Sequence, residues 1–271
     1  MRPPSLPVPE VLDEAVELVS KVAAPWLGIL WLMSLPLRLA QAHFVARVHE
    51  LGKDVHRYGD HLDGLALVAT AAFVLSLLGR AAFVTACSRK LRGVEGEGSG
   101  RTRPPFGALA AYVYVALLAE VAFYLTSVSF VLMPLFVVLA GLAAATLPQA
   151  GRAGLWRPLG AILEHSREVR PLVGLLFVFA VALLVAFANV YLLFRLGLWL
   201  AGGFVGADVA RYGALLELGN VRFSCLLVGV AVVVVEPWWL AALVVLVHKR
   251  ESLASGEDLK LWFARIQGEA E

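Results

Sequence analysis

The sequence has few charged residues and only two cysteines. Asp, Glu, Lys and Arg make up 16% of the 271 residues, whereas a soluble domain typically carries about a quarter of such residues. The two thiols, Cys87 and Cys225, cannot by themselves supply the ligands of a cysteine-based metal site. The net charge of +2 gives no indication of nucleic-acid binding. We expect both cysteines to be packing residues without a disulfide, because the topology derived below places them near opposite membrane faces.

Catalytic motifs are also missing from the sequence. It contains no Ser–His–Asp set, no phosphate-binding loop and no pair of carboxylates suited to acid–base catalysis. We therefore predict that the protein is not an enzyme and has no cofactor. A secretory signal is not expected either, because Glu10, Asp13, Glu14 and Glu17 stand where a signal carries an uninterrupted basic region.

Apolar residues are in excess, at 60% of the chain. They are concentrated in runs of about 20 residues, the length that crosses a bilayer core of roughly 30 Å. The runs predict an all-α integral membrane bundle of six transmembrane helices, forming a single transmembrane domain over residues 1–271. The third and fourth helices share one apolar run, 106–147, which suits a tight hairpin turning near 126–130. The predicted spans are 23–45, 63–87, 106–126, 129–147, 171–199 and 222–247.

Three further segments are too polar to cross the membrane but carry apolar residues on one helical face. They are the amphipathic segments 9–21, 151–169 and 257–267. Such helices lie in the membrane interface or dock a partner protein. We therefore expect interfacial helices on one side of the bundle, and the lipid bilayer and other membrane proteins as partners, with no nucleic acid.

The distribution of basic residues predicts the orientation. Lys and Arg number five in 88–105, four in 148–170 and four in 248–271, against three in 46–62, none in 126–130 and two in 200–222. Loops rich in Lys and Arg stay in the cytoplasm. Six spans place both termini on the same side, so we predict that both termini are cytoplasmic.

Five ionisable residues fall inside the predicted spans: Arg38, Arg80, Glu120, Arg195 and Glu236. Glu236 is the most conspicuous, since it stands in the apolar run "VVVVEPWWLAALVVLV" beside Pro237, which can kink the helix and aim the carboxylate inward. Buried charges in membranes usually face the bundle interior and find partners there. Arg195 is close enough to the outer end of its span to reach water.

Depth in the membrane indicates which of these charges can pair. At 1.5 Å per residue, Arg38 and Glu120 lie about 22 Å and about 21 Å from the cytoplasmic ends of their spans. Arg80 and Glu236 lie about 11 Å and about 17 Å from theirs, a gap that an arginine side chain can bridge. We therefore predict two structural pairs, Arg38–Glu120 and Arg80–Glu236, with Arg38–Glu236 as the alternative. A second interpretation makes Glu236 a proton or cation site.

Other polar residues give weaker signals. Asn189, in the fifth span, is a candidate for an interhelical hydrogen bond. Four histidines surround the first external loop, but their spacing does not place two on one helical face at i and i+4. We therefore predict solvated histidines and no metal site at His43, His49, His56 and His61.

Three stretches of the sequence carry a recognisable pattern: "LDEAVELVSKVAAPWLGILWLMSLPL", "GAILEHSREVRPLVGLLFV" and "VVEPWWLAALVVLVHKRESLASGEDLKLWFARI". They resemble a family of six-span bacterial membrane proteins similar to the membrane domain of glycerophosphoryl diester phosphodiesterases. The resemblance implies the same six-span architecture and topology, and a bacterial inner membrane as the location. It implies no catalytic residue, because the phosphodiesterase activity belongs to a separate catalytic barrel that this sequence does not contain.

Taken together, these features favour a scaffold or accessory subunit of a membrane complex. A transporter of a small molecule, lipid or ion that uses the buried Arg and Glu residues is the alternative. A membrane-embedded enzyme acting on lipid or cell-wall precursors would need a polar cluster at one interface, for which only the external histidines offer side chains.

Overall fold

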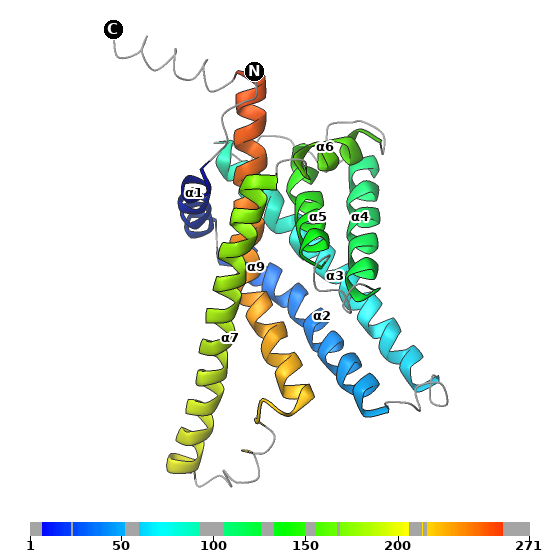
Figure 1. Ribbon diagram of the computed structural model, residues 1–271, viewed down its shortest axis with the longest axis vertical. Coiled ribbons are helices and arrows are strands. Elements are labelled where there is room, and N and C mark those ends of the chain that lie inside the picture. Colours follow the sequence, from blue (N-terminus) through cyan, green and yellow to red (C-terminus); the bar gives the residue numbers. More distant parts are fainter. Residues whose placement is uncertain are drawn as a thin grey trace. The chain divides into compact units, whose positions relative to one another are not determined.

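The computed structural model is all-α over the residues that it describes, which are 7–22, 24–51, 60–92, 106–125, 133–149, 156–166, 169–205, 213 and 216–256. A short 3-10 helix, Leu147–Gln149, follows the fifth α-helix. The described ranges contain eight α-helices: α1 Val8–Lys21, α2 Ala24–Leu51, α3 Asp60–Leu91, α4 Phe106–Leu125, α5 Met133–Thr146, α6 Trp156–Ser166, α7 Val169–Val205 and α9 Val221–Ser255 (Figure 1).

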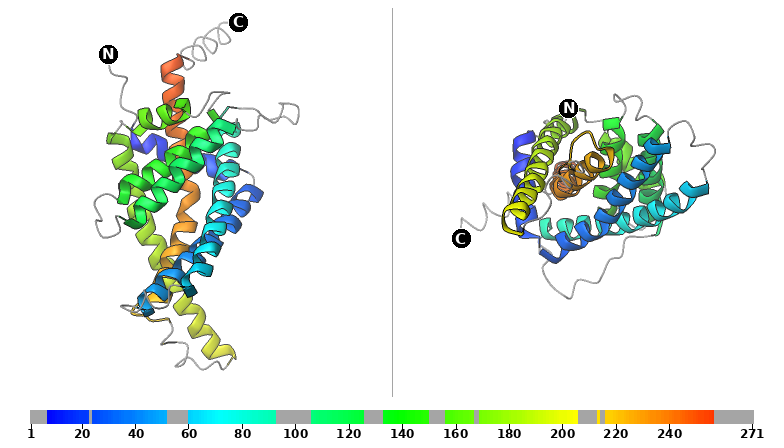
Figure 2. Two further views of the ribbon diagram at one scale, coloured as in Figure 1. Left: turned by 90° about the vertical axis from the view of Figure 1, so that its right-hand side faces the viewer. Right: turned by 90° about the horizontal axis from the view of Figure 1, so that it is seen from below.

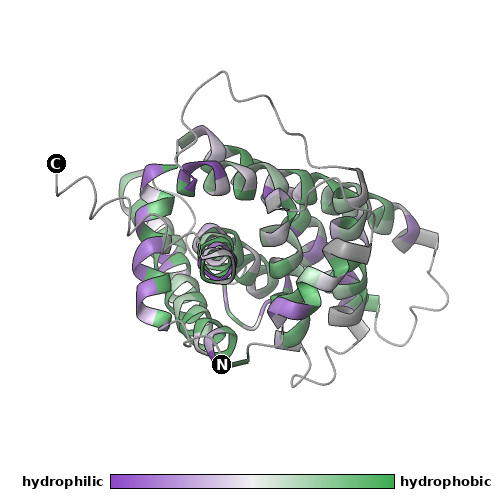
Figure 3. Cartoon of the chain, turned by 90° about the horizontal axis from the view of Figure 1, so that it is seen from above, coloured by the Kyte–Doolittle hydropathy of each residue, from purple (hydrophilic) through white to green (hydrophobic). Residues whose placement is uncertain are grey.

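Four of these helices, α2, α3, α7 and α9, are long and apolar enough to cross a membrane. Hydrophobic residues predominate along the helices (Figure 3). The apolar stretches of α4 and α5, Gly107–Val121 and Pro134–Thr146, are shorter. With 14 residues, α5 rises only about 21 Å, less than the roughly 30 Å of a bilayer core. Four of the six predicted spans are thus supported by helices of full length, whereas 106–126 and 129–147 correspond to the two shorter helices.

The helices fall into two compact units, each assembled from segments that are distant in sequence. Unit 1 comprises Met1–Ala23, Val84–Leu176 and Trp238–Glu271, and unit 2 comprises Ala24–Phe83 and Phe177–Pro237. The helices α3, α7 and α9 contribute to both. The boundary on α9 falls after Pro237, which has no backbone N–H and so leaves the carbonyl four residues earlier without its helical hydrogen bond. The prediction of one domain over the whole chain stays a prediction.

In unit 1, α4 and α5 pack along each other as the predicted hairpin, and α6 packs against both (Figures 1 and 2). The predicted turn at 126–130 lies outside the described residues. Helix α5 also contacts α9 very closely at Gly141. A Cβ atom added there would lie 2.8 Å from Nε1 of Trp239 and would overlap Leu243. Glycine at this position therefore allows two apolar helices to approach more closely than any side chain would.

Helix α1 corresponds to the predicted amphipathic segment 9–21, and its apolar face is buried within the protein. Val11, Ala15, Leu18 and Val19 are all buried. On the polar side, Nζ of Lys249 in α9 lies 2.7 Å from a carboxylate oxygen of Glu14. The apolar face of α1 is thus covered by the chain itself. The other amphipathic prediction near the chain end, 257–267, lies outside the described residues.

In unit 2, the buried residues of α2 fall into two groups around the helix axis. Leu30, Ser34 and Leu37 lie within about 60° of one another, whereas Ala42 and Ala46 lie together on another side of the helix. Two of the long helices that contribute to both units, α7 and α9, differ sharply, because 72% of the apolar stretch of α9 is buried and only 22% of that of α7. Helix α9 is therefore the core helix, and α7 presents most of its surface outward. Cys87 is buried and Cys225 half-buried, and both are free thiols.

The close contact at Gly141 generates a stability prediction. Replacing Gly141 with valine forces α5 away from Trp239 and Leu243, and overpacking of this kind costs about 1–3 kcal/mol. We expect a lower midpoint of thermal unfolding for the purified protein in detergent. The matched control is Gly28→Val in α2, because an added Cβ there has no neighbour within 4 Å. Equal midpoints for the two variants would contradict the close packing of α5 on α9.

Candidate functional site

The centre of unit 2 contains an ion pair between two spanning helices. Arg80 of α3 donates a hydrogen bond from Nε to Oε1 of Glu236 in α9, at 2.5 Å. The two side chains are only 12% and 6% exposed. Two charges held apart from water need such a contact, because the desolvation of either ion alone costs several kcal/mol. The structure thus brings together the two residues that the depth argument pairs.

Two residues of α2 complete the cluster. The guanidinium of Arg38 acts electrostatically on the carboxylate of Glu236, and Ser34 lies close enough to interact with it through its hydroxyl. Arg38 also donates to Oε1 of Gln41 at 2.8 Å. Ser34 is buried, and among the described residues its hydroxyl and Oε2 of Glu236 have no hydrogen-bond partner of standard geometry. We call Ser34, Arg38, Arg80 and Glu236 the intramembrane charge cluster.

The helices around the cluster approach closely because glycine stands at two contact points. A Cβ on Gly79 of α3 would lie 2.8 Å from Cβ of Met33 in α2, and one on Gly229 of α9 would lie 3.0 Å from Cβ of Arg38. Pro36 of α2 has no backbone N–H, so the carbonyl of Leu32, within one turn of Ser34, lacks its helical hydrogen bond. Close helix contacts and a missing helical hydrogen bond therefore lie next to the charged side chains.

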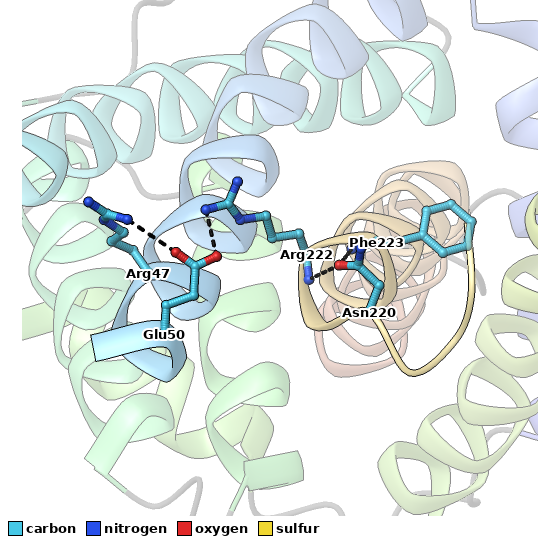
Figure 4. A network of polar contacts seen from close by, with 5 residues as sticks. All are labelled: Arg47, Glu50, Asn220, Arg222 and Phe223. Carbon is cyan, nitrogen blue, oxygen red and sulfur yellow. Dashed lines mark hydrogen bonds and ion pairs between the residues drawn. The ribbon is translucent and has the colours of Figure 1, made fainter. Parts of the chain in front are cut away.

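A second polar network joins the end of α2 to the start of α9 (Figure 4). Glu50 accepts contacts from two arginines, Arg47 at 3.1 Å and Arg222 at 2.5 Å. Asn220 caps α9, since its Oδ1 accepts hydrogen bonds from the backbone N–H groups of Arg222 and Phe223. Unlike the cluster, these side chains are half-exposed, so water screens the charges and each pair stabilises the fold only slightly.

The structure places the other predicted residues as follows. Glu120 is a half-buried residue of α4, in unit 1, and the Arg38–Glu120 pairing stays a prediction. Arg195 lies on α7 with its guanidinium carbon 5.9 Å from the ring centroid of Tyr191. Asn189 is exposed on α7 and donates to the carbonyl of Val185, one turn earlier in the same helix, at 2.9 Å. Its predicted hydrogen bond to another helix stays a prediction.

The four histidines around the predicted first external loop are only partly described. His43 and His49 are exposed residues of α2, whereas His56 and the side chain of His61 lie outside the described part. Within the described residues, no group of three or more His, Cys, Asp or Glu side chains could hold a metal ion. The intramembrane charge cluster is therefore the site with the most distinctive chemistry.

The sequence contained a signal for Ser34 that the depth argument did not use. Ser34, Arg38 and Gln41 stand at i, i+4 and i+7, so they share one face of α2. That face meets the carboxylate of Glu236. Chemically, two guanidinium groups, a hydroxyl and one carboxylate can hold three helices together, or can bind a proton or a small polar group.

No protein-family model matches the chain, and neither a curated protein nor a solved structure matches it.

The cluster generates a prediction about the coupling of its charges. Arg80→Met leaves Glu236 buried without its hydrogen-bonded partner, a change that typically costs about 3–5 kcal/mol. Glu236→Gln removes the charge that Arg80 faces. We expect the double variant to lose much less stability than the sum of the single variants, with a coupling energy of about 0.5–3 kcal/mol in a double-mutant cycle. Thermal unfolding in lipid-containing micelles measures all four proteins.

The second polar network, which contains Glu50 and Arg222, offers a matched control at the same distance. Arg222 and Glu50 are also 2.5 Å apart, but their side chains are 53% and 40% exposed. The cycle of Arg222→Met and Glu50→Gln should therefore give at most about 1 kcal/mol. A coupling for Arg80 and Glu236 no larger than that of the exposed pair would show that burial does not strengthen the contact.

Proposed function

We propose that the protein is a non-enzymatic, multi-pass subunit of a bacterial inner-membrane complex, acting as a scaffold or accessory chain. The observation that carries this proposal is that the charged side chains of the intramembrane charge cluster contact one another between helices. Arg80 and Glu236 contact each other between α3 and α9, where Gly79 and Gly229 let α2 pack closely against these helices. Charges committed to contacts between helices favour a structural role.

The proposed topology keeps both termini in the cytoplasm. The basic residues concentrate in 88–105, 148–170 and 248–271, and such segments are retained on the cytoplasmic side. The shorter helices α4 and α5 form a hairpin, so the chain returns to the side from which it entered whether the hairpin crosses fully or partly. Six spans and four spans with a re-entrant hairpin therefore lead to the same position of the termini.

The resemblance to the membrane domain of glycerophosphoryl diester phosphodiesterases supports the same proposal. It rests on the sequence patterns around the first span, the segment before the fifth span and the Glu–Pro–Trp step at 236–238. These patterns fit a membrane part that works together with other proteins. They support no phosphodiesterase activity in this chain.

One observation favours a second candidate, a transporter of a proton or a small polar solute. Oε2 of Glu236 and Oγ of Ser34 are buried without a hydrogen bond of standard geometry in the described structure. A buried polar atom is costly unless something satisfies it, and a transported proton or solute group would do so. In this alternative, Glu236 is the binding group and Arg80 its counter-ion.

An exchange of the two charges distinguishes the two functions. In the double variant R80E/E236R the ion pair can form in the reverse sense, so a structural role predicts recovery of the stability and complex assembly that each single variant loses. Assembly is measured by purifying the tagged chain from its native membrane in mild detergent and weighing the intact particle by native mass spectrometry. A transporter instead predicts that the exchange restores folding but not proton or solute uptake into proteoliposomes.

The corresponding exchange of Arg222 and Glu50 serves as the control, since its single variants should leave assembly unchanged. A wild-type chain that is purified alone from its native membrane, and that transports a solute in that form, would contradict the subunit proposal. A particle with a second chain in fixed stoichiometry would support it.

A further inference from the structure

Asn189 is a polar residue on the most exposed of the long helices. Helix α7 is a single long helix (Figure 2), and only 22% of its apolar stretch is buried. Between Arg170 and Arg195 the helix carries no charged residue. Asn189 stands in this stretch, about 9 Å along the axis from Arg195 and about 28 Å from Arg170. Its exposed side chain thus lies within the apolar stretch of a helix long enough to cross a membrane, where we expect it to face the hydrocarbon.

The amide of Asn189 has hydrogen-bonding capacity left over. A primary amide offers two N–H donors and one carbonyl oxygen. One donor is used by the carbonyl of Val185 in the same helix, and the described structure shows no further hydrogen bond of this side chain. One N–H and the amide oxygen thus face lipid, where no water is present to satisfy them and each unsatisfied group is costly.

The surroundings of Asn189 form a face that no other helix of unit 2 covers. Tyr191 and Phe194 mark the side of α7 that meets α9, since their rings lie 6.3 Å and 5.7 Å from that of Phe223. At 3.6 residues per turn, Asn189 points about 160° and about 140° away from these two residues. On its own side lie exposed apolar residues such as Val185 and Leu193.

We propose that this face of α7 binds the same face of α7 in a second copy of the chain, with the two Asn189 amides hydrogen-bonded to each other. Each amide oxygen accepts the remaining N–H of the other copy, while the bond to Val185 is kept. Ala182 and Ala186 lie on this face as well, and small residues allow two helices to approach closely in a membrane. The exposed leucines and valines then pack around the amide pair.

A second copy fits this face for a geometric reason. Two copies inserted in the same orientation are related by a two-fold axis along the membrane normal, so the same residue of each copy lies at the same depth. An amide is both donor and acceptor, so it is complementary to itself. A different membrane protein would need its own polar group at that depth and on its exposed side. The self-association does not depend on the proposed function.

The test compares three full-length proteins in liposomes of bacterial phospholipids. Their monomer–dimer equilibrium is measured by single-molecule photobleaching over a range of protein-to-lipid ratios. We expect dimers for the wild type and a dissociation constant raised roughly 3- to 30-fold for Asn189→Leu, the range that one to two membrane hydrogen bonds provide. The control is Leu184→Ala, because Leu184 points about 140° away from Asn189 and is 68% exposed, so this change should leave the equilibrium unchanged.

A crosslinking experiment locates the contact. In a Cys87→Ala, Cys225→Ala background, with copper phenanthroline added as the oxidant, Leu193→Cys should form an intermolecular disulfide in liposomes and Leu184→Cys should not. Because Asn189 is exposed, Asn189→Leu should keep the thermal midpoint of the wild type, which separates lost association from lost folding. Monomeric wild type at every ratio, an unchanged equilibrium for Asn189→Leu, or equal crosslinking at both positions would overturn the proposal. A wild type that associates only with another membrane protein would do the same.

Discussion

The fold of unit 2 depends on one constraint: an ionised side chain inside a membrane must be satisfied by the protein. The carboxylate of Glu236 cannot be hydrated where it lies, so the guanidinium of Arg80 takes the place of water at 2.5 Å. This contact requires α3 and α9 to lie within reach of two side chains, and it draws α2 close through Arg38 and Ser34. Gly79 and Gly229 are consistent with that requirement, since larger residues would hold the helices apart.

Helix α9 contributes residues to both units and makes polar and close packing contacts within each of them. Its N-terminal end is capped by Asn220 and linked to α2 through Arg222 and Glu50 (Figure 4). The stretch after Pro237 is almost completely buried and contacts α5 at Gly141, and nearer the C-terminal end Lys249 pairs with Glu14 of α1. Helix α9 thus makes polar contacts near both ends and apolar contacts between them, and the buried ion pair of Glu236 with Arg80 is the exception.

The same physical rule accounts for the contrast between α9 and α7. Glu236 is buried and forms an ion pair with Arg80 of the same chain. The amide of Asn189 is exposed, and only one of its hydrogen-bonding groups is used within its own helix. The cost of a polar group in hydrocarbon is the same kind of cost in both cases. For α9, the ion pair with Arg80 offsets this cost within the chain. For α7, the proposed contact with Asn189 of a second copy would offset it.

The sequence by itself predicted the membrane class, the all-α fold and the position of the long helices, and it offered Arg80 and Arg38 as alternative partners of Glu236. It could do so because hydrophobic length and the rise of 1.5 Å per residue fix depth. Depth says nothing of direction around a helix axis or of how near two helices come. Only the tertiary structure could therefore show that Ser34 joins the cluster, that Arg80 rather than Arg38 makes the direct contact with Glu236, and that α1 buries its apolar face within the chain. It also showed that α5 is shorter than the apolar run suggested, because a run of apolar residues does not reveal where a helix ends.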